Sequence, residues 1–159
     1  MSLHATGAVL PEFFRLEEFV HPIIFRTFGS QSIRMVSAFQ IEYATALRNL
    51  MGPIRINNWH LGGNLQSRGT RPRSVKPKGG AEFSQHYLAN ALDTDTPDFK
   101  PSEMVECIHD NFDLFFNLGL RAIEDVNYTP TWLHGDCRLL WPDQIKQIKE
   151  TKKFITVRP

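Results

Sequence analysis

Apolar side chains recur at helical spacing in the first third of the chain. They stand three or four positions apart, which places them on one face of an α-helix. Gly52 and Pro53 follow directly and end this helix. Upstream, residues 13–29 predict short helical turns that break at Pro22 and stop at Gly29. The apolar face consists of Val36, Phe39, Tyr43, Leu47 and Leu50.

A second helical pattern covers residues 100–119. Ser102 stands where an N-cap is expected, and Gly119 provides a stop. The inner apolar positions between them are Met104, Ile108, Phe112 and Phe115.

The remaining apolar positions favour strands. Residues 120–126 and 131–138 read as two strands joined by a hairpin at 127–130. Helices that flank a small, mostly antiparallel sheet make an α+β fold. The other expected strands are 54–59, where apolar and polar residues alternate, 89–95 and 152–157.

Residues 60–85 show little periodicity and contain several glycines and prolines. A loop this long in a small domain is usually functional or disordered. It also carries a basic cluster, which can be a solvated face or a contact surface for an anionic polymer. The members of this cluster are Arg68, Arg71, Arg73, Lys76 and Lys78.

Composition narrows the class of protein. The chain has 159 residues, of which 42% are hydrophobic, and a formal net charge of +1. We expect one domain over 1–159, with an N-terminal helical extension at 1–30. The near-neutral charge predicts no general attraction to nucleic acid or to a membrane surface. Two cysteines are too few for a disulfide framework.

No apolar run reaches the length of a membrane span, and no basic start precedes an apolar stretch of the secretory type. We therefore expect neither a membrane partner nor a signal peptide. If the substrate lies outside the cytoplasm, something other than this N-terminus must deliver the protein to it.

Three residues are candidate metal ligands. His134 lies in the middle of a predicted strand, with Asp136 on the same face, and His86 precedes Asp93 by seven positions. Catalytic zinc is typically held by three protein ligands and a water, which His86, Asp93 and His134 would provide. Seven is an odd spacing, so His86 must lie at a loop end, with a kink before the strand. By residue type alone, ordinary hydrogen-bonded groups remain the alternative.

The short sequence motifs around these residues resemble those of a family of zinc peptidases. Ser84, His86, Ala91 and Asp93 match its Ser-x-His and Ala-x-Asp pattern. The last motif of the family is an aromatic and an aliphatic residue followed by His-x-Asp, often with an arginine two positions later. The matching residues here are Trp132, Leu133, His134, Asp136 and Arg138. The chain is thus similar, over residues 12–140, to the D-Ala-D-Ala carboxypeptidases and L-alanyl-D-glutamate endopeptidases that cut peptidoglycan peptides. The stretch "LEEF", the helix before "GPIRINNW" and the glycine pair before Ser84 also resemble a phage-associated branch of this family.

The resemblance implies the hedgehog-like D-Ala-D-Ala carboxypeptidase fold, a zinc cofactor and hydrolysis of cell-wall peptides. It implies metal ligation by His86, Asp93 and His134. Arg71, in the word "SRGTRP", would stabilise the oxyanion or hold a substrate carboxylate, with a solvated loop arginine as the alternative. Ser84 would bind substrate or cap the loop. A phage-encoded protein would be made in the cytoplasm of its host.

The chain departs from the family pattern at two positions. Ala89 replaces a glycine, which costs about 1–2 kcal/mol if that position needs a positive φ. Thr131 stands where many members have the catalytic acid. An active enzyme must therefore recruit another carboxylate, and we expect Glu124 rather than Asp125, because its longer side chain reaches further. The alternative is that both are solvated charges of the hairpin.

Two further hypotheses remain. The chain can be a non-catalytic metal-binding or structural module of a phage particle, which keeps the fold but has lost the acid. Alternatively, the basic loop can bind nucleic acid, which would require a strongly salt-dependent affinity.

Overall fold

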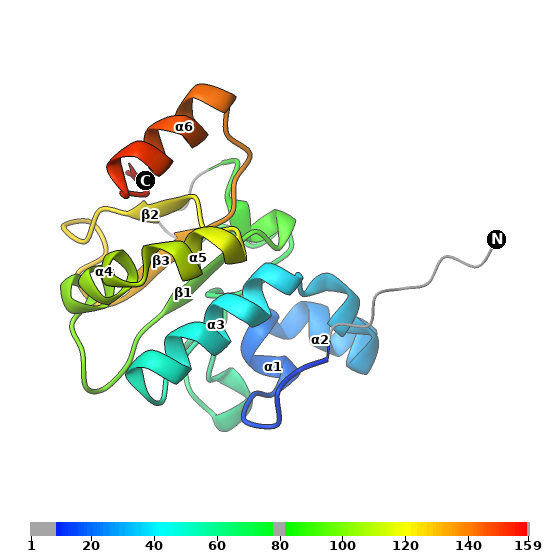
Figure 1. Cartoon of the computed structure of the whole chain (residues 1–159). Coiled ribbons are helices and arrows are strands. Elements are labelled where there is room, and N and C mark those ends of the chain that lie inside the picture. The colour runs from blue at the N-terminus through cyan, green and yellow to red at the C-terminus, as the bar shows by residue number, and fades with distance from the viewer. Residues whose placement is uncertain (1–8, 78–81, 159) are drawn as a thin grey trace.

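The computed structural model describes residues 9–77 and 82–158, and it has an α+β architecture. Residues 1–8 of the expected extension and Lys78 of the basic cluster lie outside the described residues. Figure 1 shows helices gathered around one small sheet. The helices are α1 (Leu16–Phe19), α2 (Pro22–Phe28), η1 (Gly29–Met35), α3 (Ala38–Met51), η2 (Trp59–Leu61), η3 (Gln85–Leu88), α4 (Pro101–Asp110), α5 (Phe112–Leu118) and α6 (Pro142–Thr151).

The sheet is mixed and has four strands in the order β1-β3-β2-β4. The strand β3 pairs antiparallel with β1 and with β2, whereas β4 pairs parallel with β2. The expected antiparallel pair and the expected last strand are thus present. The strands are β1 (Ala91–Thr94), β2 (Ala122–Glu124), β3 (Leu133–Asp136) and β4 (Ile155–Val157).

The two faces of the sheet differ in chemistry because side chains alternate along a strand. One face is apolar and carries Leu92, Ile123 and Leu133, all buried in the core. The opposite face carries Asp93 and His134, which are direct cross-strand neighbours. The alternation therefore separates a packing face from a polar face.

Helices cover the apolar face. The helix α3 contacts β1, α4 contacts β3, and α5 packs on α3. Tyr43 of α3 is fully buried between Phe39 and Phe115 and approaches β3 at Gly135, where a side chain would overlap the phenol ring. Most of the predicted stripe on α3 is buried, but Leu50 is 41% exposed. No described helix is long and apolar enough to cross a membrane.

The N-terminal helical segment packs against the long loop. A single bridge joins Val20 to Thr70, and the Thr70 amide donates to the Phe19 carbonyl at 2.7 Å. Gly69 is in close contact with the Phe19 backbone, and a Cβ atom there would overlap it. The helices α1 and α2 therefore position the loop that carries Arg71.

The prediction of a strand at residues 54–59 is wrong. Only Arg55 forms a bridge, to Asp95, and the chain then turns into η2. Ile54 and Ile56 are buried as alternation predicted, but Asn57 is buried as well and donates to the Val20 carbonyl. The side chains of this segment bind the N-terminal helices, and its backbone does not join the sheet.

The helix expected over residues 100–119 is two helices, interrupted at Asn111. The Asn111 side chain donates to the Cys107 carbonyl and so closes α4. The predicted N-cap is also wrong, because the helix begins at Pro101 and Ser102 is already inside it. Proline favours the first helical position, which moves the start upstream.

The helix α6 has no counterpart among the expected elements. It is polar on most of its surface and buries Ile148. Its start signals were present in the sequence, since Pro142 stands at the first helical position and Asp143 in the first turn. With so few apolar positions, the periodic signal was too weak to indicate it.

Candidate metal centre

The polar face of the sheet places three functional side chains in a row. Asp93 of β1 lies directly opposite His134 of β3. In the β2–β3 pair Ile123 lies opposite Gly135, so one further step along the antiparallel register sets Glu124 beside His134. His134, on the middle strand β3, therefore lies between Asp93 of β1 and Glu124 of β2, and each strand is about 4.8 Å from the next.

His86 reaches this row from η3, outside the sheet. The Ser84 hydroxyl caps η3 by accepting the His86 amide at 3.4 Å. Ala89 ends η3 in the left-handed region, with φ of 57°, and the chain then enters β1. This is the kink that the odd spacing between His86 and Asp93 required. It also shows that the position of the missing glycine does adopt a positive φ.

His86, Asp93 and His134 have the geometry of a metal site. Their ligand atoms all lie within 4.8 Å of one another. Asp93 Oδ1 is 2.7 Å from His134 Nδ1 and 3.3 Å from His86 Nε2. Two imidazole nitrogens and one carboxylate oxygen are suitable ligands for zinc and leave a fourth position open. These residues can therefore hold a metal ion.

Hydrogen bonds fix which nitrogen of each imidazole faces the site. His86 Nδ1 lies 3.0 Å from the Gly69 carbonyl, which can only accept, so Nδ1 carries a proton and Nε2 is the nitrogen that faces Asp93. His134 Nε2 lies 3.1 Å from Asp136 Oδ2, so its Nδ1 is turned toward Asp93. Such partners orient metal-binding imidazoles.

Asp136 is fully buried behind His134. Arg138 donates to it through Nε at 2.8 Å, through Nη2 at 2.5 Å and through its backbone amide at 3.1 Å. Burial by itself raises the pKa of Asp136, but Arg138 and His134 outweigh that effect and lower it. Asp136 therefore stays ionised and accepts a hydrogen bond from His134 Nε2. Its role is to fix the orientation of the His134 ring.

Protonation of the metal-free triad follows from its charges. Burial by itself raises the pKa of Asp93, but His86 and His134 lower it well below its ordinary value. Burial lowers the pKa of His134, yet its hydrogen bonds to Asp136 and Asp93 raise it to about 10. Without a metal, His134 thus carries a proton between two carboxylates, in the place where a cation would bind.

Glu124 is partly buried in the wall of the same cleft, as Asp93 and His134 are. Burial raises its pKa above the ordinary value. That direction suits a carboxylate that accepts and returns protons near neutral pH. Asp125 instead binds Asn127 in the following turn, and its amide donates to the Val157 carbonyl. The strand therefore directs Glu124, and not Asp125, to the site.

Arg71 is 6% exposed, so the alternative of a solvated loop arginine is excluded. Its guanidinium donates to the Ser67 carbonyl at 2.5 Å and to the Ser84 hydroxyl at 2.9 Å, and it lies over the Tyr87 ring. Among the described residues no carboxylate lies within ion-pair distance of it, and its buried Nε has no hydrogen-bond partner. Arg71 thus lines the cleft as a cation held by neutral oxygens, while the charge of Asp93 acts on it without a direct ion pair.

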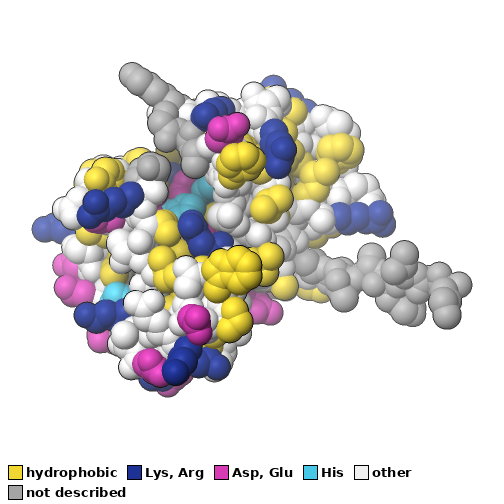
Figure 2. Space-filling model, turned by 90° about the horizontal axis from the view of Figure 1, so that it is seen from above, with side chains coloured by type: hydrophobic (Ala, Val, Ile, Leu, Met, Phe, Trp, Pro, Cys, Tyr) yellow, Lys and Arg dark blue, Asp and Glu magenta, His cyan; other side chains and the backbone are white. Residues whose placement is uncertain are grey.

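The cleft has a volume of about 620 Å³. Seen from above, histidine side chains lie at the floor of a hollow, with basic and acidic groups beside them (Figure 2). Thr131, at the position of the missing acid, is exposed and is not part of the lining. Four further lining residues had no signal in the sequence, and they come from the turn after β2 and from the chain at and just after the end of β4: Tyr128, Thr129, Val157 and Arg158.

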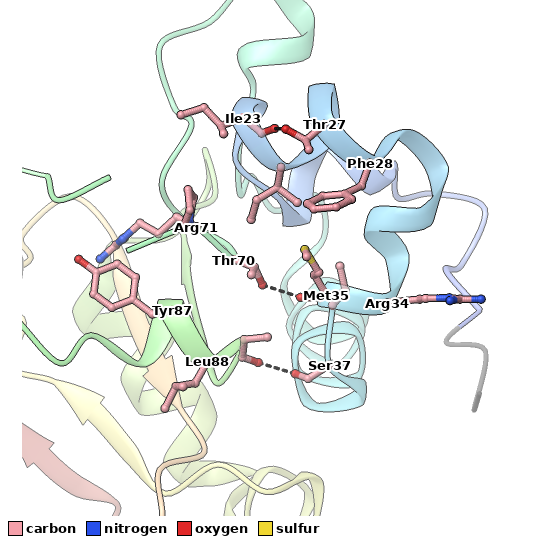
Figure 3. Close-up of a pocket in the computed structure, with 14 residues that line it drawn as sticks. Ile23, Thr27, Phe28, Arg34, Met35, Ser37, Thr70, Arg71, Tyr87 and Leu88 are labelled. Carbon is pink, nitrogen blue, oxygen red and sulfur yellow. Dashed lines mark hydrogen bonds between the residues drawn. The ribbon is translucent and has the colours of Figure 1, made fainter. Parts of the chain in front are cut away.

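A second hollow, of about 560 Å³, lies on the other side of η3 between that helix and the N-terminal helices (Figure 3). Two hydrogen bonds cross it. The Ser37 hydroxyl donates to the Ala89 carbonyl at 2.6 Å, and the Thr70 hydroxyl donates to the Met35 carbonyl at 3.0 Å. Arg71 extends away from this hollow, toward Tyr87. The Ser37 bond holds the end of η3, and with it His86, against the helices, and the Thr70 bond holds the loop before it.

Comparison with known proteins finds no relative of this chain: no protein-family model matches it, and neither do curated proteins or solved structures.

Proposed function

We propose that this chain is a zinc-dependent peptidase that hydrolyses peptide bonds of peptidoglycan, as a carboxypeptidase or an endopeptidase. The observation that carries the proposal is the position of Glu124, a partly buried carboxylate beside a His–Asp–His metal site on the same face of the sheet. Metal-assisted hydrolysis needs this combination of an open metal site and an adjacent base. The choice of substrate rests on the resemblance of the two sequence motifs, around His86 and Asp93 and around His134, to those of the peptidoglycan peptidases.

A bound zinc ion would supply a Lewis acid and would lower the pKa of a coordinated water to about 7. His86, Asp93 and His134 are the residues that would hold it. Glu124 takes a proton from the attacking water and later delivers it to the leaving amine. Burial raises the pKa of Glu124 above its ordinary value, which makes this carboxylate a stronger base than an exposed one.

Arg71 and Ser84 bind the substrate. The Arg71 guanidinium is oriented by the Ser84 hydroxyl and the Ser67 carbonyl, so little conformational freedom is lost when it engages an anion. A buried cation without a carboxylate partner favours either the developing oxyanion or a substrate carboxylate.

The test is Glu124→Gln, which keeps the size of the side chain but removes its basicity. We expect wild-type zinc content and fold, and about 10²- to 10⁴-fold slower hydrolysis of a peptidoglycan peptide. Glu106→Gln, on the exposed side of α4, is the matched control and should keep full activity. Turnover at the wild-type rate in the Glu124 variant would exclude this residue from the mechanism.

A second candidate function is a metal-binding structural module without catalysis. The exposed Thr131 at the usual position of the acid favours it. A wild-type protein that is fully loaded with zinc but cleaves no wall peptide would support this candidate over the peptidase.

Two of the basic residues on which the nucleic-acid hypothesis depends are not free to bind phosphates. Arg68 is bound to Asp95, and Arg71 is buried, which leaves Arg73 and Lys76 as exposed members of the cluster within the described residues. Two exposed cations are too few for the many phosphate contacts that strong, salt-dependent binding requires.

A further inference from the structure

One end of the cleft is built by residues that the metal site does not use. They come from the turn after β2 and from the end of β4 with the residue that follows it, and the sheet order places β4 three strands away from β1. Neighbouring strands are about 4.8 Å apart, so β4 lies about 14 Å from β1. Since η3 contacts β1, Arg71 and this group lie on opposite sides of His134. Its members are Tyr128, Thr129, Val157 and Arg158.

The arginines that line the cleft differ in how firmly they are paired. Arg68 binds Asp95 and is 13% exposed, and Arg138 forms two side-chain hydrogen bonds to Asp136 and is 30% exposed. Arg158 is 71% exposed, and its nearest described carboxylate, Asp125, is 3.8 Å away. The Asp125 side chain is 17% exposed, but a pair this long, with its arginine mostly in solvent, is weak. The charge of Arg158 is therefore free to bind a ligand.

Two neighbours complete the group. The Arg158 guanidinium lies over the Tyr128 ring, 5.7 Å from its centroid, which restricts its orientation. Thr129 is 2% exposed, and its hydroxyl has no hydrogen-bond partner among the described residues. A buried hydroxyl without a partner is costly unless something binds it. A cation, an aromatic ring and an unpaired hydroxyl together suit a carboxylate.

We propose that Tyr128, Thr129 and Arg158 form an outer subsite that binds a carboxylate of the substrate, away from the scissile bond. This proposal rests on the proposed function, because it describes the substrate of the same cleft. The strand β4 is about 10 Å from β3, and an extended peptide advances about 3.3 Å per residue. The carboxylate recognised here is therefore about three residues from the bond that is cut.

The chemical consequence is a preference among wall peptides. Stem peptides whose D-glutamate keeps a free α-carboxylate would bind better than those in which this group is a carboxamide. The two differ by one charge and almost nothing in shape, so the subsite would discriminate by electrostatics and hydrogen bonding alone.

The experiment compares two synthetic probes, L-Ala-γ-D-Glu-L-Lys-D-Ala-D-Ala and the same peptide with D-isoglutamine at the second position. Dissociation constants are measured by calorimetry on zinc-loaded Glu124→Gln protein, which should bind without turnover. The kcat and KM values are measured on protein that keeps Glu124. Each measurement is repeated with Arg158→Gln and with Lys146→Gln, an exposed cation of α6, as the matched control.

We expect about three- to tenfold tighter binding of the carboxylate peptide. The preference should disappear in Arg158→Gln, persist in Lys146→Gln, and affect KM rather than kcat. Equal binding of both probes, binding of neither, or a preference that survives in Arg158→Gln would overturn the subsite. If the protein hydrolyses both peptides equally, the peptidase stands without the subsite. If it hydrolyses neither but binds with an Arg158-dependent preference, the subsite stands without the peptidase.

Discussion

At the scale of single residues, the triad depends on which atoms carry protons. His134 lies between Asp93 and Asp136, and these two carboxylates raise its pKa to about 10, from an ordinary 6.5. The proton on His134 occupies the position that a metal ion needs. Metal affinity and pH are therefore linked.

We expect zinc to bind as one ion and to displace about one proton from His134 near neutral pH. The sign follows from the raised pKa: His134 is protonated in the metal-free protein below about pH 10, so zinc affinity rises as the pH increases toward that value. Calorimetric titrations in two buffers with different ionisation enthalpies measure the released protons.

Substitution identifies the ligands in the same assay. His86→Ala and His134→Ala should lose most of their zinc, whereas His60→Ala, in η2 and outside the triad, should retain it. Unchanged zinc content in both ligand variants, or binding without proton release, would show that the triad is not the metal site.

Ala89 carries backbone strain beside the site. Its φ of 57° lies in the left-handed region, where a non-glycine residue costs about 1–2 kcal/mol. We expect Ala89→Gly to stabilise the protein, by up to about 1 kcal/mol, since glycine also loses more entropy on folding. Urea denaturation measures the change, and a destabilised variant would show that the Ala89 side chain contributes packing that outweighs the strain.

At the scale of elements, one residue connects the helix layer to the metal site. The Ser37 hydroxyl accepts the Gln40 amide at 3.2 Å and so caps α3, and it also donates to the Ala89 carbonyl at the end of η3. The start of α3 thereby sets the position of the short helix that carries His86.

Ser37→Ala should destabilise the protein by about 1–2 kcal/mol, because it removes both a helix cap and a bond between elements. Ser102→Ala is the matched control. Ser102 is exposed and caps no helix, so its loss should cost less than about 0.5 kcal/mol. Equal costs in chemical denaturation would contradict the double role of Ser37.

At the scale of the whole molecule, the N-terminal helices and the short helix η3 meet at Gly69. Its carbonyl accepts the His86 proton at 3.0 Å, and its α-carbon is in close contact with the Phe19 backbone. The N-terminal segment is therefore structurally linked to the metal site.

Gly69→Ala should destabilise the fold by about 1–3 kcal/mol, since the added methyl group overlaps the Phe19 carbonyl and cannot be relieved by a side-chain rotation. It should also weaken zinc binding, because the carbonyl that orients His86 must move. Thermal unfolding of the metal-free variant and a zinc competition assay separate the two effects. A variant with wild-type stability would show that the two backbones can move apart freely.

The sequence by itself determined the features that depend on local order. Helical periodicity located α3, Pro22 and Gly29 delimited α2, and alternation placed His134 and Asp136 on one face of a strand. The odd spacing between His86 and Asp93 required a turn, and the structure has one at Ala89. These features follow from the geometry of a single segment, which is why the sequence contains them.

Only the tertiary structure decided the features that depend on distant segments. Alternation could not choose the register that sets Glu124 beside His134, because register arises from the pairing of two strands. The burial of Arg71 depends on contacts with Ser67 and Ser84 that no periodicity reveals. The strand β4 pairs with β2 although β3 and α6 separate the two strands in the sequence. This parallel pairing brings Arg158, which follows β4, to the cleft. Long-range pairing, and not residue type, therefore decided which charges surround the candidate metal site.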